Sequence, residues 1–248
     1  MSAPAASRGL ALPPRRLRFM GESDDEFIAL GDGLAAILER HAELGDATRL
    51  LDIGCGYGRL PHALRRRRFR GSYLGMDVQR PHIRWCRRHL ATASVRFEHV
   101  DLRNERYNRR GRSSVADLDL GGERFDVICA FSLFTHMWPD DVDAYLRFAA
   151  GALAPNGRLI ATVFLIEDHW RSLKERGRVR LTLPYERAEY CRYESEDDPL
   201  HVVAYEAAWF VQRALAHGLV PIVAEHGTWS GRPVDVPDYQ DVAVFRPA

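Results

Sequence analysis

The chain has 248 residues, of which 46% are hydrophobic, and its formal net charge at pH 7 is +1. This length and hydrophobic content favour one large α/β domain with a buried core over two small domains. The small net charge gives no general attraction to nucleic acid or to an anionic membrane. No run reaches the ~20 apolar residues that a membrane helix requires, so no membrane association is expected.

The cysteines and the start of the chain indicate where the protein resides. The four cysteines show no CxxC pairing and are too few for a disulfide scaffold, which favours a reducing, cytoplasmic compartment and no structural metal. Residues 1–20 are rich in Ala, Ser, Pro and Arg and contain no apolar signal segment. We therefore expect a flexible N-terminal leader or a flap at 1–20, followed by a single domain over 21–248.

Hydrophobic spacing predicts the elements of the first half of the chain. Apolar residues from Phe27 recur at helical intervals and predict a helix ending near Gly45. A short apolar strand, 49–53, precedes a glycine-rich turn and a helix over 60–68, in which Pro61 is tolerated in the first turn. Two further strands, 72–78 and 95–100, flank a helix that begins at Pro81. Strands therefore alternate with helices from residue 49 onward.

The second half continues this alternation. The apolar run 125–131 is typical of a parallel strand covered on both faces, and Asp140 or Asp141 can cap the helix that follows. A turn at 155–157 precedes a strand over 159–166, and the polar segment 167–200 is expected to form a cap or insertion. A helix over 207–217 and two strands, 219–224 and 240–245, complete the chain. The order predicts a doubly wound, mostly parallel seven-stranded sheet with a C-terminal antiparallel strand pair.

The turn after the first strand contains the clearest functional motif. Asp52 ends the strand, and Gly54, Gly56 and Gly58 alternate through the turn. Glycine permits positive φ and leaves space for a ligand against the main chain. A dinucleotide site would require GxGxxG, and Arg59 occupies the last position of that pattern, which disfavours a nicotinamide dehydrogenase. A carboxylate at Asp52 suits a ligand with a cationic amino group better than one with a pyrophosphate.

Two more carboxylates follow the next two strands. Asp77 lies 19 positions after Gly58, where an acid can accept both hydroxyls of a ribose. Asp101 follows the third strand, where it can meet the amino group of an adenine. Any single strand-end Asp can equally be a helix cap or a solvated surface residue. Three in register with the glycine turn indicate an adenosyl ligand with a cationic amino-acid end.

Taken in order, the runs LLDIGCGYGRL, GMD, HVDL, FDVICAFSLFTHM and LAPNGRLIATVFL resemble class I S-adenosylmethionine-dependent methyltransferases with a Rossmann-like fold. The likeness covers about residues 50–166. It implies S-adenosylmethionine as cofactor, and the residues expected to contact it are Asp52, Gly54, Cys55, Gly56, Gly58, Asp77, Val78, Asp101, Leu102, Phe131 and Ser132. The segments SLFTHM, GTWSGR and YQDVAV are similar to a bacterial subgroup that acts on small hydroxylated acceptors, often sugars. At Tyr107-Asn108-Arg109 the chain departs from the YNP-like run of that subgroup.

Methyl transfer to a hydroxyl requires alignment of the reacting atoms and removal of a proton. His136, after the fourth strand, is the candidate base, and its alternative role is to support the structure or orient the acceptor. Aromatic residues could line an acceptor pocket or serve in packing: Trp138, Tyr185, Tyr190, Tyr193, Trp209 and Trp229. Arg232 and Asp241 could bind an oxygen-rich acceptor or pair with each other.

Several functions remain open at the level of sequence. Residues 131–134 read FSLF where amide and exocyclic-amine methyltransferases carry an Asn-Pro-Pro-Tyr-like run, which favours methylation of oxygen or of a simple amine. We expect a hydroxyl of a small molecule or glycan to be the acceptor. N-methylation is one alternative. RNA methylation is another, because arginines are abundant in the middle of the chain, although no separate nucleic-acid-binding module is evident. A regulator that binds the cofactor without catalysis is a further alternative. The sequence does not define the oligomeric state.

Overall fold

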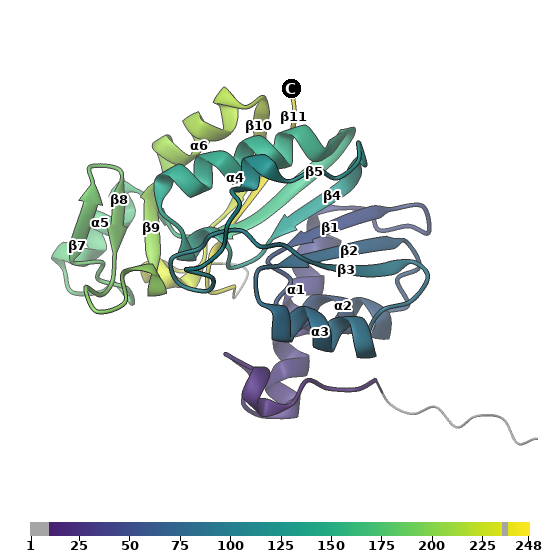
Figure 1. Cartoon of the computed structure of the whole chain (residues 1–248). Coiled ribbons are helices and arrows are strands. Elements are labelled where there is room, and N and C mark those ends of the chain that lie inside the picture. Colours follow the sequence, from purple (N-terminus) through teal and green to yellow (C-terminus); the bar gives the residue numbers. More distant parts are fainter. Residues whose placement is uncertain (1–9, 235–237) are drawn as a thin grey trace, which may run out of the picture.

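The computed structural model describes residues 10–234 and 238–248 and shows the predicted α/β architecture. Seven strands form one sheet in the order β10-β11-β5-β4-β1-β2-β3 (Figure 1). Their bounds are β1 Arg49–Ile53, β2 Ser72–Asp77, β3 Val95–His99, β4 Phe125–Ala130, β5 Leu153–Val163, β10 Leu219–Glu225 and β11 Asp241–Pro247. The strands from β3 to β5 are parallel, whereas β11 is antiparallel to both β5 and β10. The predicted fold class is confirmed.

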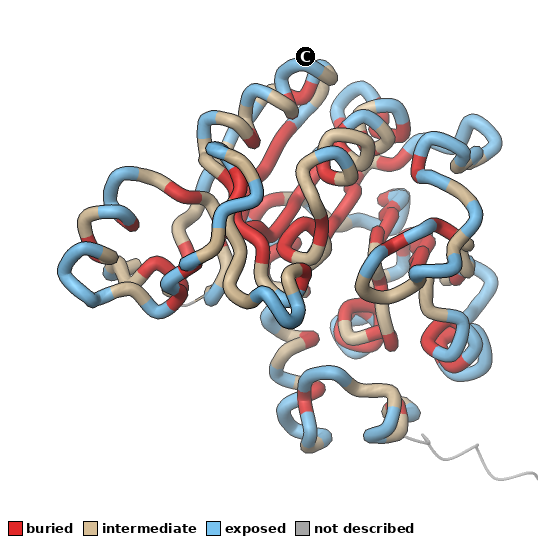
Figure 2. Tube along the Cα trace, turned by 60° about the vertical axis from the view of Figure 1, so that its left-hand side comes forward, coloured by how far each residue is buried: buried red, intermediate tan, exposed pale blue. Residues whose placement is uncertain are grey.

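Helices cover both faces of this sheet, as the apolar runs of its strands require. The helices of the first half, α1 Asp24–His41, α2 Arg59–Arg66 and α3 Arg80–His89, pack on one face. The opposite face is covered by α4 Pro139–Ala152 and α6 Ala207–Ala216 (Figure 1). Buried residues follow the central strands and the inner sides of these helices (Figure 2). The strand order reverses between β1 and β4, so ligand-binding chemistry is expected at the carboxyl ends of these strands.

Several predicted boundaries change, and three of these changes have clear local reasons. α1 begins before Phe27, because Ser23 accepts a hydrogen bond from the Glu26 amide and Glu26 reciprocates in a capping box. Neither predicted aspartate caps α4, whose N-cap is Trp138 followed by proline at the first helical position. The turn predicted at 155–157 lies within β5, which already begins at Leu153 and carries a register irregularity there.

The polar segment 167–200 contains regular structure that its sequence does not indicate. It forms α5 Asp168–Glu175, β7 Tyr185–Ala188, β8 Cys191–Tyr193 and most of the 3-10 helix η4 Pro199–His201. With β6 Leu165–Ile166 and β9 Val203–Glu206, the strands build a second sheet in the order β6-β9-β8-β7. This second sheet stands beside the carboxyl end of the central sheet (Figure 1). We refer to residues 167–200 as the insertion.

Residues 10–20 lie against the domain. Arg18 donates to the carbonyls of Pro13 and Ser23, and the carbonyl of Leu17 accepts a hydrogen bond from Nε2 of His82 on α3. The predicted flexibility of 1–20 cannot be compared for residues 1–9, which lie outside the described residues. Within the described part of the chain, no helix has the length and apolar character needed to cross a membrane.

Candidate functional site

A cavity that is open to solvent lies at the carboxyl ends of β1, β2 and β4. Its walls come from the glycine turn, from the segment after β2, from the loop after β3 and from the segment after β4. Ten of the twelve predicted site residues line it: Asp52, Gly54, Cys55, Gly56, Asp77, Val78, Leu102, Phe131, Ser132 and His136. The topology therefore gathers side chains that are far apart in the sequence.

The glycine turn forms one wall of the cavity. Gly54 and Gly56 have φ of +80° and +54°, a region that other residues rarely adopt. A Cβ atom added at Gly56 would meet nothing within 4 Å, so this glycine is required by conformation and leaves open space above the main chain. The amides of Gly54 and Cys55 both donate to the carbonyl of Met76, at 2.8 and 3.0 Å, which ties the turn to β2.

Asp52 is buried at the end of β1, where the phenolic hydroxyl of Tyr73 donates to its Oδ2 at 2.6 Å. Burial raises the pKa of Asp52 to about 6, although the Tyr73 hydrogen bond opposes this shift. At neutral pH the carboxylate is therefore ionised, and it has no ion-pair partner among the described residues. Such a group attracts a cationic ligand.

Asp77 links the end of β2 to the glycine turn. Its Oδ2 accepts from the amide of Gly56 at 2.9 Å and its Oδ1 from the amide of Gln79 at 2.7 Å. These two hydrogen bonds fix the carboxylate plane, while burial raises the pKa of Asp77 to about 6. Each oxygen keeps a lone pair for a further donor.

Two predicted contact residues do not line the cavity. Gly58, with φ of +85°, is the N-cap of α2, and a Cβ there would lie 2.6 Å from Leu90 and 3.0 Å from the sulfur of Cys86. This glycine allows α2 and α3 to pack closely. Asp101 instead accepts hydrogen bonds from Arg112 at 3.0 Å and Asn108 at 3.2 Å, and this pairing lowers its pKa.

The segment after β4 carries the candidate base. Ser132 has a positive φ of 51°, and its amide donates to Oγ1 of Thr162 at 2.7 Å. One helical turn later, in the 3-10 helix η3 Phe134–His136, Nδ1 of His136 lies 2.9 Å from the carbonyl of Leu200. Because a carbonyl only accepts, Nδ1 carries the proton and Nε2 of the neutral ring keeps its lone pair. Burial is the largest influence on the pKa of His136 and lowers it.

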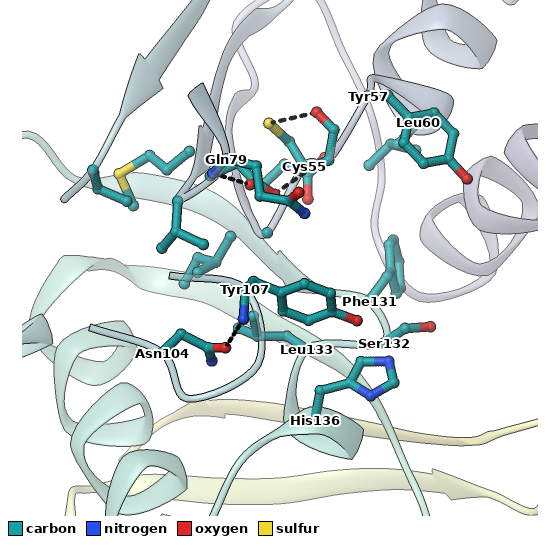
Figure 3. Close-up of a pocket in the computed structure, with 18 of the residues that line it drawn as sticks. Cys55, Tyr57, Leu60, Gln79, Asn104, Tyr107, Phe131, Ser132, Leu133 and His136 are labelled. Atoms are coloured by element: carbon teal, nitrogen blue, oxygen red, sulfur yellow. Dashed lines mark hydrogen bonds between the residues drawn. The ribbon is translucent and has the colours of Figure 1, made fainter. Parts of the chain in front are cut away.

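The cavity also contains residues that sequence reasoning missed. The ring of Tyr107 stands edge-on to that of His136, with centroids 5.8 Å apart, and Figure 3 shows both beside Ser132. Phe19 and Met20 reach the cavity from the N-terminal segment, and the Tyr57 hydroxyl bonds both the amide and the carbonyl of Met20. An apolar pair within a polar leader was the only available signal for these two. Among the residues that the structure describes, Arg59 is the one Arg or Lys in the lining.

Arg232, Asp241 and the six aromatic residues suggested for an acceptor pocket all lie outside the cavity lining. Arg232 and Asp241 do not pair with each other, since Arg232 binds Glu167 at 2.8 Å. Asp241 is buried and accepts three hydrogen bonds, from the amides of Leu165 and Gly227 and from the indole of Trp229. It therefore anchors the closing segment. None of the six aromatic residues suggested for the acceptor pocket lines the cavity.

Comparison with protein families places the chain. Residues 23–199 match the methyltransferase domain family, and this stretch covers most of the chain and every cavity-lining residue except Phe19 and Met20. The chain belongs to this family. The resemblance to class I S-adenosylmethionine-dependent methyltransferases that the motifs indicate is thereby confirmed.

Curated relatives resemble only part of the chain. It is 33% identical over 116 residues to the ubiquinone biosynthesis O-methyltransferase of Methylobacterium nodulans, which covers 47% of this chain and 41% of the relative. The corresponding protein of Azorhizobium caulinodans is 33% identical over 114 residues, or 46% of this chain and 39% of the relative. The chain thus spans about two fifths of the length of the curated relatives it matches.

Solved structures share the fold at low sequence identity. The CcbJ methyltransferase of Streptomyces caelestis superimposes with a TM-score of 0.58 at 18% identity, covering 88% of this chain and 89% of the other. A 1,6-didemethyltoxoflavin-N1-methyltransferase of Burkholderia thailandensis, solved with S-adenosylhomocysteine, gives 0.56 at 19% identity, covering 91% and 80%. At these identities the likeness establishes the fold alone.

Proposed function

We propose that the protein is an S-adenosylmethionine-dependent methyltransferase that methylates a hydroxyl of a small acceptor. The observation that carries this proposal is the meeting, in one cavity, of the glycine turn, two buried carboxylates and a neutral histidine with an unprotonated Nε2. The family match and the O-methyltransferase relatives support the same reaction.

The cavity wall fits the cofactor. Gly56 leaves open space above the main chain, and Asp52 offers an unpaired carboxylate to an ammonium group. The two oxygens of Asp77, held by the amides of Gly56 and Gln79, suit the two hydroxyls of a ribose. Val78, Leu102 and Leu133 supply apolar surface for a flat adenine. When bound, the cofactor supplies an electrophilic methyl group on a positively charged sulfur.

The chain's own contribution to the chemistry is positioning and proton removal. We assign to Nε2 of His136 the removal of the acceptor's hydroxyl proton, because the Leu200 carbonyl holds the ring in the tautomer that leaves Nε2 basic. The lowered pKa of His136 keeps the ring neutral at pH 7. The ring of Tyr107, edge-on to that of His136, provides aromatic surface beside this nitrogen.

We place the acceptor between Tyr107, Ser132 and His136, beside the insertion. These side chains combine flat rings with hydroxyl groups, and they suit a compact hydroxylated ring, whether a phenol or a sugar. The insertion contributes the Leu200 carbonyl behind the base, and its loops are expected to contribute to acceptor selection.

The test is incubation with S-adenosylmethionine labelled on the methyl group and with three classes of acceptor: catechols and phenols, monosaccharides, and RNA. Labelled O-methyl product from a phenol or sugar supports the proposal, while label on nitrogen or RNA contradicts it. Binding of S-adenosylhomocysteine without product from any acceptor would instead favour a non-catalytic binding protein. Calorimetric titration with NAD provides the negative control.

A further inference from the structure

Beside the glycine turn the cavity is lined by one cation and by a buried carboxylate other than Asp77, whose oxygens accept from the amides of Gly56 and Gln79. Asp52 supplies the carboxylate, and Arg59, the first residue of α2, supplies the guanidinium. Arg59 is close enough to lower the pKa of Asp52, yet the two form no ion pair within 4.0 Å. Among the described residues, no acidic side chain pairs with Arg59 either.

The guanidinium of Arg59 is held in place by its surroundings. Its Cζ lies 5.7 Å from the centroid of the Tyr57 ring, within the range of a cation–π contact. The Tyr57 hydroxyl is in turn bonded to the Met20 amide at 3.1 Å and to the Met20 carbonyl at 2.8 Å. A guanidinium resting on a fixed ring is preorganised to bind a carboxylate through two parallel hydrogen bonds.

Separate, unpaired charges of opposite sign at one end of a cavity complement a zwitterion. A ligand with only an ammonium group would leave Arg59 unbalanced, and a simple anion would leave Asp52 unbalanced. The α-amino acid end of the cofactor carries both charged groups on one carbon atom. The first turn of α2 contains no acidic residue, and the positive end of a helix dipole also favours an anion.

We propose that Arg59 forms the subsite for the α-carboxylate of the cofactor, opposite Asp52, which receives the ammonium group. This inference rests on the proposed function and deepens it. Arg59 and Asp52 recognise the amino-acid end of the cofactor, whereas Asp77 recognises the ribose of the nucleoside. Arg59 is then a binding residue that selects ligands with an intact amino-acid end.

The experiment titrates two ligands by calorimetry at pH 8, where Asp52 is ionised. S-adenosylhomocysteine has the amino-acid end, and 5′-methylthioadenosine has the same nucleoside without it. We expect Arg59→Ala and Arg59→Gln to weaken the binding of S-adenosylhomocysteine about 10- to 100-fold. This is the loss in affinity expected when one charged hydrogen-bonded pair is removed. Affinity for methylthioadenosine should stay within about twofold. Arg59→Lys should give an intermediate loss, since it keeps the charge without the planar fork.

Arg84→Ala, an exposed arginine on α3 outside the cavity, is the matched control and should change neither affinity. The inference is overturned if the Arg59 variants bind S-adenosylhomocysteine as the wild type does, or if they lose both ligands equally. Retained methylthioadenosine binding shows that a variant has kept a folded cavity. If the wild-type protein binds neither ligand, the proposed function itself fails, and this outcome is distinct from either of the others.

Discussion

The Tyr73 hydroxyl on β2 donates to Asp52 on β1 at 2.6 Å, and both side chains are buried. The two strands pair in parallel, with Leu50 opposite Tyr73 and Asp52 opposite Gly75. Tyr73, which does not line the cavity, thus favours the ionised form of Asp52, which does. This contact opposes the effect of burial, because a hydrogen bond to the ionised form lowers the pKa of Asp52.

Tyr73→Phe should therefore weaken S-adenosylhomocysteine binding in a pH-dependent way. Without the donor, the pKa of Asp52 rises further, so that more of the protein holds a neutral acid at pH 7. We expect a several-fold loss of affinity at pH 7 that largely recovers at pH 8.5, and a loss of about 1 kcal/mol in unfolding free energy. Calorimetry at both pH values measures the effect, with Tyr239→Phe at an exposed position as control. Equal losses at both pH values would contradict it.

Asp52→Asn should stabilise the protein without ligand while reducing cofactor affinity. The folded-state pKa of about 6 lies above the ordinary value of 3.8 for this carboxyl group, so the folded state holds the proton more tightly than the unfolded state. This contribution to stability is complete below pH 3.8 and is lost as the pH rises to about 6. Above that pH, ionisation costs up to about 3 kcal/mol, which asparagine avoids.

Urea unfolding at pH 8 should therefore show Asp52→Asn more stable than wild type by about 1–3 kcal/mol, with the difference vanishing at low pH. The exposed Asp197→Asn serves as the control for loss of a negative charge. A buried group that is retained at a cost in stability is typical of a functional site. Equal stabilities at pH 8 would show that the carboxylate is not strained by burial.

Turnover should depend on a neutral His136. Its pKa lies below 6.5 because burial disfavours the imidazolium, and Arg106 and His201 act in the same direction. The midpoint of the acid limb in the plot of kcat against pH should lie below pH 6.5. His136→Gln should lower kcat about 10²- to 10⁴-fold, because it removes the base. S-adenosylhomocysteine affinity should be unchanged.

The measurement uses the acceptor identified by the labelled-methyl screen, with the exposed His169→Gln as control. Imidazole resonances followed by NMR titration give the pKa of His136 independently of any acceptor. An acid limb above 6.5, or full turnover by His136→Gln, would remove this residue from the role of base.

Gly58→Ala should destabilise the fold. The new Cβ would lie 2.6 Å from Cδ1 of Leu90, which is too close for a packing contact. Residue 58 also has a φ of +85°, which alanine rarely adopts, so the backbone would be strained as well. We expect a loss of about 1–3 kcal/mol in unfolding free energy by urea titration. Gly45→Ala is the control, because a Cβ there meets nothing within 4 Å, and it should change stability by less than about 0.5 kcal/mol.

The parallel strands could be predicted because they are short, apolar and bounded by turn residues. β1 begins and ends where the sequence indicates, and β2 to β4 differ by one residue at their carboxyl ends. The insertion could not be predicted, since its hydrophobic residues, such as Trp170 and Leu183, pack into a small separate cluster with no regular spacing. Regular spacing of hydrophobic residues predicts elements that pack on a large core, and it does not predict elements that pack on a small one.

The ends of the parallel strands predict the position of the ligand site, and the side chains that directly follow β1, β2 and β4 do line the cavity. The prediction fails for Asp101, which a neighbouring arginine and asparagine hold outside the lining. It also cannot anticipate Tyr107 or Phe19, which arrive on loops whose paths depend on tertiary contacts. Loop residues carry no periodic signal, so their place in a site becomes visible only in three dimensions.

The hydrogen bond from His136 to residue 200 joins the proposed base to the last part of the insertion. Its acceptor is a main-chain oxygen, which every amino acid provides. The side chains of the insertion can therefore diverge, and admit new alcohols, without moving the proton from one ring nitrogen to the other. Divergence in what is methylated is thus separated from the chemistry of methylation, provided that the backbone keeps its course at residue 200.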